Sequence, residues 1–163
     1  MNWGSILRTV ICCVILIMLH YTVRPLLGWR APIDFMLIAV LFGAVRMRPG
    51  VAAMYGLALG LVSDALAVSG FGAAALGMTI VAYAASWLKA VFFADNLALN
   101  AFFLFVGKWV FDIIVVLAAR RIVGTELAMQ IFVWSPLAAA LTAGAGAIVL
   151  TMLRPIMELR PTA

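Results

Sequence analysis

The chain has 163 residues, of which 67% are hydrophobic and 10% are charged, and its mean hydropathy is +1.22. A soluble domain of this size carries about a quarter charged residues, so this composition excludes a water-soluble globular protein and indicates an integral membrane protein. The net charge of +5 does not indicate nucleic-acid binding, because the basic residues lie at the ends of apolar runs, where they anchor helices and set topology. The length allows one domain, residues 1–163, nearly all of it inside the lipid bilayer.

Six apolar segments follow one another along the chain, and each is predicted to be a membrane helix. They span about residues 6–23, 32–45, 50–66, 71–93, 97–119 and 129–153. The first segment lacks the small-residue cleavage pattern of a signal peptide, so it is interpreted as a helix of the protein itself. The second, expected to begin at Pro32, is short for a full span of about 20 residues, so we expect it to be tilted or to lie where the bilayer is thin.

The connections are predicted to be short. They comprise a loop at Leu26–Ala31, a basic turn at Arg46–Pro49, a cap at Asp95–Asn96, a loop at Gly124–Ala128 and a stop at Arg154–Pro155. Six helices place both termini on one side of the membrane. With the termini in the cytoplasm, six basic residues are internal (Arg8, Arg46, Arg48, Lys89, Arg154, Arg160) and four are external (Arg24, Arg30, Arg120, Arg121). This asymmetry favours cytoplasmic termini.

The third predicted helix carries glycines and a carboxylate on one face. Gly56, Gly60 and Asp64 are spaced four residues apart, so a helix places them in one row. Glycines in such a row let another backbone approach closely, as in membrane helix packing. A loop with Gly70 and Gly72 then breaks the helix, and we expect it to open next to Asp64.

Lys108 and Asp112 lie inside the fifth predicted helix, four residues apart on one face. A charge at the centre of a membrane helix costs roughly 2.5–3.5 kcal/mol, which pairing offsets in part. The lysine-before-aspartate order is the weaker one for an isolated pair, so we expect a third partner. At about 1.5 Å per residue, Asp64 lies about 21 Å along its helix and Asp112 about 22 Å along its own. Similar depth predicts one polar cluster of Asp64, Lys108 and Asp112.

Structural roles are the alternatives at each of these positions. In the structural interpretation, the charged cluster only holds the third and fifth predicted helices together. In the same interpretation, Gly56 and Gly60 only allow close helix packing. Cys12 and Cys13 are interpreted as small buried hydrophobes and His20 as an interfacial histidine. The sequence shows no nucleophile paired with histidine, no metal-ligand spacing and no phosphate-binding glycine loop, so we expect neither an enzyme nor a cofactor or metal.

The chain resembles a known bacterial family over about Pro32 to Asp112. The resemblance rests on Arg30-Ala31-Pro32 before a short apolar helix, on the basic turn Arg46–Pro49, and on the pattern G-x-x-x-G-L-x-x-D from Gly56 to Asp64. A glycine-bearing loop and Ala75-Leu76-Gly77 follow that pattern. In these features the sequence is similar to the bacterial rod shape-determining protein MreD.

The resemblance implies a non-enzymatic component of the cell-elongation machinery in the bacterial inner membrane. In that family the protein associates with MreC, a single-span membrane protein, and acts beside the MreB filament, the RodA glycosyltransferase and its transpeptidase in peptidoglycan synthesis. The family is also thought to share the fold of the substrate-binding subunit of energy-coupling-factor transporters. That fold implies an outward pocket lined by Asp64 and its glycines, with Lys108 and Asp112 at the floor.

Two functions therefore stand as hypotheses, a membrane scaffold of this type and the substrate-binding subunit of a vitamin-type transporter. The sequence has no large external loop to cap a vitamin, which favours the scaffold. A groove for the partner's membrane helix is expected on a small-residue face, either Gly56 with Gly60 or Ala139 with Ala143 and Gly146. On this hypothesis Gly60→Leu disrupts assembly with the partner but not membrane insertion.

Overall fold

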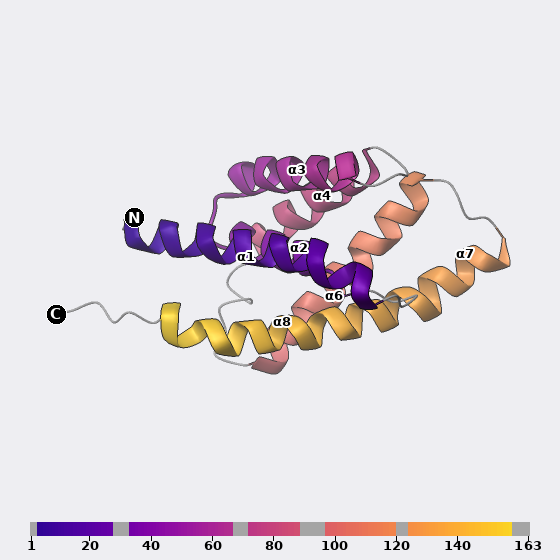
Figure 1. Cartoon of the computed structure of the whole chain (residues 1–163). Helices are drawn as coiled ribbons and strands as arrows, with labels where there is room; N and C mark the ends of the chain where they lie inside the picture. Colours follow the sequence, from indigo (N-terminus) through magenta and orange to yellow (C-terminus); the bar gives the residue numbers. More distant parts are fainter. Residues whose placement is uncertain (1–2, 28–32, 67–71, 89–96, 120–123, 158–163) are drawn as a thin grey trace.

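The structure, a computed structural model, describes residues 3–27, 33–66, 72–88, 97–119 and 124–157, and these parts of the chain form a bundle of helices without strands (Figure 1). The helices are α1 (Trp3–Leu27), α2 (Phe35–Ala44), α3 (Pro49–Leu66), α4 (Ala73–Trp87), α6 (Leu97–Ala119) and a continuous run of α7 (Thr125–Met129), η1 (Gln130–Trp134) and α8 (Ser135–Met157). The described residues thus form six helical segments, which confirms the all-helical prediction.

The bounds of α3 and α6 match their predictions to within a residue. Several other predicted bounds are wrong. Helix α2 begins at Phe35 rather than at Pro32, and α4 ends at Trp87, with Leu88 as its C-cap. Helix α1 continues through Pro25 to Leu27, α8 continues through Pro155 to Met157, and the predicted loop after Gly124 is helical from Thr125. Prolines are tolerated in membrane helices because neighbouring helices satisfy the freed backbone groups. The predictions for residues 28–32, 89–93, Asp95–Asn96 and Gly70 lie outside the described residues.

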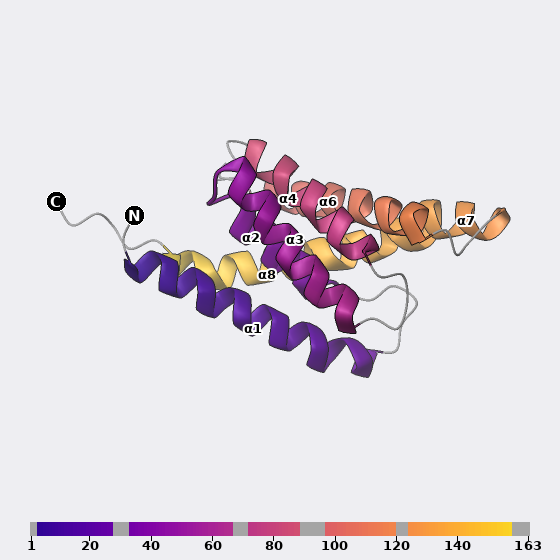
Figure 2. The ribbon, with the colours of Figure 1, turned by 90° about the horizontal axis from the view of Figure 1, so that it is seen from above.

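Three helices in the described part of the chain are long and apolar enough to cross a membrane, judged by length and composition. They are Pro49–Leu66, Ala98–Ala119 and Thr125–Met152, and shorter apolar helices are Val10–Thr22, Phe35–Ala44 and Ala73–Trp87. The first residues of α1 and the last residues of α8 lie at the same end of the bundle in both views (Figures 1 and 2). This arrangement is the one that an even number of membrane crossings produces.

Helix α2 forms the centre of the bundle. All ten of its residues are buried, and it packs against α1, α3, α4, α6 and α8. Helix α1 runs along one edge of the bundle, and α4 and α6 lie at the opposite edge (Figure 2). At 1.5 Å per residue, α2 is about 15 Å long, or half the thickness of the hydrocarbon core. One end of α2 must therefore lie inside the membrane.

The glycine row of α3 packs directly on α4. A Cβ atom at Gly56 would lie 2.7 Å from the Ala82 Cβ, and one at Gly60 would lie 2.8 Å from the Ala74 carbonyl oxygen. The close approach that the sequence predicts is therefore a contact within the chain. This corrects the expectation of a partner groove at these glycines, because α4 already covers them.

The second small-residue face, on α8, is also internal. Ala139 and Ala143 are buried, and a Cβ atom at Gly146 would lie 2.5 Å from Leu104 of α6. The neighbouring Gly144 has nothing within 4 Å. The alternative partner groove on this helix is therefore occupied by α6.

The helical run that ends in α8 contains a π-helical turn, η1, directly before Pro136. The Ser135 amide donates to the Gln130 carbonyl, five residues earlier. In the same register the Ile131 carbonyl would accept from residue 136, which is a proline without an amide proton. That carbonyl instead accepts the Trp109 indole Nε1–H at 3.0 Å. A side chain of α6 thus satisfies the backbone group that the proline leaves open.

This contact predicts a specific cost for losing the indole donor. We expect Trp109→Phe to lower the free energy of unfolding by about 1–3 kcal/mol, because it leaves a carbonyl without a donor where water is absent. The measurement is a melting curve in detergent. Trp87→Phe is the matched control, because Trp87 is 69% exposed. Equal melting temperatures for the two variants would contradict the assignment.

Candidate functional site

The N-terminus of α2 is the point around which the buried polar residues gather. The first four amides of a helix have no partner within it, and inside a membrane no water replaces one. Asp34 is the N-cap, and its Oδ1 accepts the Leu37 amide at 3.1 Å. His20 Nδ1 of α1 accepts the Met36 amide at 3.3 Å, and Thr142 Oγ1 of α8 accepts the Asp34 amide at 3.2 Å. Side chains of α1 and α8, together with the N-cap Asp34 itself, therefore cap the start of α2.

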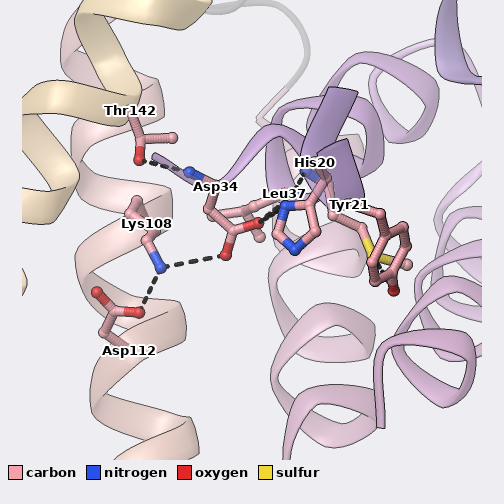
Figure 3. A network of polar contacts seen from close by, with 8 residues as sticks. His20, Tyr21, Asp34, Leu37, Lys108, Asp112 and Thr142 are labelled. Carbon is pink, nitrogen blue, oxygen red and sulfur yellow. Dashed lines mark hydrogen bonds and ion pairs between the residues drawn. The ribbon is translucent and has the colours of Figure 1, made fainter. Parts of the chain in front are cut away.

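Lys108 joins this cap to α6. Its Nζ lies 3.2 Å from Asp34 Oδ2 and 2.6 Å from Asp112 Oδ1, and it also lies 5.0 Å from the centre of the Phe111 ring. The lysine is 6% exposed. Figure 3 shows the ammonium group between the two carboxylates, with His20 on the far side of Asp34. The cluster of His20, Asp34, Lys108, Asp112 and Thr142, called here the α2-cap network, links α1, α2, α6 and α8.

The sequence predicted a third partner for the pair of Lys108 and Asp112, and the structure identifies it as Asp34 rather than Asp64. Asp34 was missed, although an aspartate immediately before an apolar run is the signal of a helix N-cap. The predicted start of that helix at Pro32 is wrong, because α2 begins at Phe35. His20 was interpreted as interfacial, and this was wrong, because it is 2% exposed and contacts the cap.

Asp64 caps a different helix. Its carboxylate oxygens accept the amides of Gly72 at 3.0 Å, Ala74 at 3.1 Å and Ala75 at 2.8 Å. Gly72 is the N-cap of α4, and Ala74 and Ala75 lie in its first turn, where the helix dipole favours a negative charge. Gly72 has a φ of 97° and no side chain to cap the helix, so the carboxylate comes from α3. The single cluster predicted from Asp64, Lys108 and Asp112 is therefore corrected to two separate caps.

The predicted pocket around Asp64 is likewise corrected, because this side chain is 4% exposed and lies in the contact between α3 and α4. A cavity of about 180 Å³ instead lies between α4 and α6. Its lining is apolar and comprises Leu41, Ile80, Val81, Ala84, Ala85, Leu88, Phe103, Val106, Gly107 and Val110. None of the charged residues of either cap lines it.

The α2-cap network pairs buried charges and caps the start of α2. Two carboxylates, one ammonium group and one imidazole meet in a space where each charged group costs several kcal/mol unless it is paired. The network holds no serine or cysteine that could act as a nucleophile. Among the residues that the structure describes, no group of three or more histidine, cysteine, aspartate or glutamate side chains is arranged to hold a metal ion.

The bundle and its internal caps define an all-helical, multi-pass membrane protein in which the buried charged residues that the structure describes, Asp64 and Lys108, contact the chain's own helices. The family model of the rod shape-determining protein MreD matches residues 3–159, and the chain belongs to this family. It is thus a membrane component of the system that determines rod shape. Neither the comparison with curated proteins nor the comparison with solved structures gave a match.

Proposed function

We propose that this protein is a non-enzymatic scaffold of the bacterial cell-elongation machinery in the inner membrane, with both termini in the cytoplasm. In this role it binds the single-span protein MreC and so supports the regulation of peptidoglycan synthesis by RodA and its transpeptidase beside the MreB filament. The observation that carries the proposal is the family match, which extends over residues 3–159 and so includes every described helix.

The internal caps support a scaffold role. The described charged side chains deepest in the bundle, Asp64 and Lys108, contact α4 and the α2-cap network respectively. Large apolar side chains such as Met18, Phe102 and Met152 are exposed on the outer surface. Buried charges that contact the chain's own helices, together with an apolar exterior, suit a protein that acts by presenting its surface to membrane helices.

The proposed contact for the MreC membrane helix is the apolar cavity between α4 and α6. The two small-residue faces predicted from the sequence are occupied by helices of the chain itself. The cavity offers Ala84, Ala85 and Gly107, and small residues let another membrane helix approach closely. An added helix would also cover Ile80 and Val110, which are exposed and partly line the cavity.

The experiment is purification of the tagged chain from membranes, followed by mass spectrometry of what is bound. We expect MreC to be recovered with the unchanged chain and at least tenfold less with Ala84→Phe, because the larger side chain fills the cavity. Ala58→Phe, the same change on an exposed position of α3, should leave recovery unchanged. A melting curve of each variant separates lost binding from lost folding.

The other outcomes of this experiment are informative. Recovery of a transporter ATPase in place of MreC would overturn the scaffold proposal and support the transporter subunit. Undiminished MreC recovery with Ala84→Phe would reject the cavity as the contact while leaving the scaffold role intact.

A further inference from the structure

The hydroxyl of Ser135 has no hydrogen-bond partner among the residues that the structure describes, although this serine is only 1% exposed. Buried hydroxyl groups are ordinarily bonded, because an unbonded one inside a protein costs free energy. A serine or threonine inside a helix can donate to the carbonyl three or four residues earlier. Thr151 does so in the same helix, where its hydroxyl donates to the Ile148 carbonyl at 2.8 Å. The turn that precedes Ser135 must therefore determine why its hydroxyl stays unbonded.

That turn is η1, and the proline after it permits two backbone registers. In the π register that the structure shows, the Ser135 amide donates five residues back and the Ile131 carbonyl accepts the Trp109 indole. In the α register the Ser135 amide would donate to the Ile131 carbonyl, so the indole would not be needed. The Phe132 carbonyl would then be open, because Pro136 has no amide proton to give it. This carbonyl lies three residues before Ser135, within reach of its hydroxyl.

We propose that η1 is a two-register turn between α7 and α8, with a different side-chain donor for each register. The Trp109 indole satisfies the open carbonyl of the π register, and the Ser135 hydroxyl satisfies the open carbonyl of the α register, at Phe132. The ring of Pro136 crowds the Phe132 carbonyl in an α-helix, which favours the π register. Loss of the extra residue of the π turn rotates α7 by about 100° relative to α8 and shifts it by about 1.5 Å.

This rotation changes what the chain presents at one end of the bundle. Helix α7 lies at the end opposite the chain termini and extends beyond the ends of α1 and α3 (Figures 1 and 2). Met129 at the end of α7 is 54% exposed, and Phe132 in η1 is 71% exposed. A partner that contacts one face of α7 would therefore select one register, as a ligand selects one of two conformations.

The first test is a double-mutant cycle between Ser135 and Trp109, read as melting temperatures of the purified chain in detergent. Ser135→Ala alone should not lower the melting temperature, because the hydroxyl has no partner in the π register. In the Trp109→Phe chain the π register leaves a carbonyl open, so the α register is favoured. There Ser135→Ala should lower the melting temperature by about a further 2–4 °C, as expected for one lost hydrogen bond in a chain of this size.

The exposed Trp87 provides the control background for this cycle. Ser135→Ala should have no effect in a Trp87→Phe chain, because Trp109 still supplies its indole to the π register. Equal effects of Ser135→Ala in the Trp109→Phe and Trp87→Phe backgrounds would overturn the proposal.

A distance measurement tests the rotation independently. Spin labels are attached to Glu126→Cys in α7 and Ile148→Cys in α8, both at exposed positions, in a chain whose two native cysteines are replaced by alanine. Trp109→Phe should change the distance between the labels, and Trp87→Phe should not. Pro136→Ala should also change it, because alanine supplies the missing amide and fits an α-helix. An unchanged distance in either Trp109→Phe or Pro136→Ala would overturn the proposal.

Discussion

Lys108→Met should lower the free energy of unfolding by about 3–5 kcal/mol, which is the usual effect of removing one partner from a buried ion pair. The ammonium group is the bridge between Asp34 and Asp112, whose side chains are 12% and 16% exposed. Without it, both carboxylates lose this ion pair in a low-dielectric interior. Melting curves of the purified variants in detergent measure the loss. Arg48→Met, at an exposed position between α2 and α3, is the control and should melt like the unchanged chain.

Combined variants test which carboxylates belong to the network. Adding Asp112→Leu to Lys108→Met should recover only part of the loss, because Asp34 still lacks its ion pair with the lysine. Adding Asp34→Asn as well should recover more, since asparagine still caps α2. Full recovery in the double variant Lys108→Met with Asp112→Leu would argue against Asp34 as a partner of the lysine. The effects of Lys108→Met and Asp64→Asn should be additive within about 0.5 kcal/mol, as is usual for separate sites.

The second large effect concerns the contact between α3 and α4. We expect Gly60→Ala to lower the free energy of unfolding by about 3 kcal/mol, at the upper end for overpacking. The new methyl group would meet the backbone of Ala74 and Ala75, and a helix backbone cannot move aside as a side chain can. The same displacement would pull the Ala75 amide away from Asp64, so the cap of α4 would weaken with the packing.

Gly144→Ala is the matched control for this prediction, because a Cβ atom there meets nothing within 4 Å. It should be neutral or slightly stabilising, since alanine favours a helix over glycine. The sequence led us to expect that bulk at Gly60 would impair partner binding alone. The structure changes the expected result to a loss of folding, which a melting curve detects without any partner. If Gly60→Ala melts like Gly144→Ala, the face of α3 with Gly56 and Gly60 would again be a candidate surface for partner binding.

Hydropathy and spacing were sufficient to predict the membrane class, the helical fold and the pairing of Lys108 with Asp112. The scarcity of charge leaves no alternative to burial in lipid, and a four-residue spacing on a helix places two side chains together whatever surrounds them. The bounds of α3 and α6 could also be read from the sequence, because each apolar run is long and ends at turn or charged residues. All of these features are local along the chain.

The third partner of Lys108 is not local, because Asp34 lies 74 residues away in the sequence. Similar depth along α3 and α6 favoured Asp64, and that comparison did not include Asp34, which lies before α2, a helix of only ten residues. A helix that starts inside the bundle brings its unpaired amides there, and Asp34, His20 and Thr142 accept their hydrogen bonds. Asp64 is drawn to the start of α4 for the same reason. Which carboxylate meets which helix end depends on how the helices stack in three dimensions, and spacing along one helix carries no information about that.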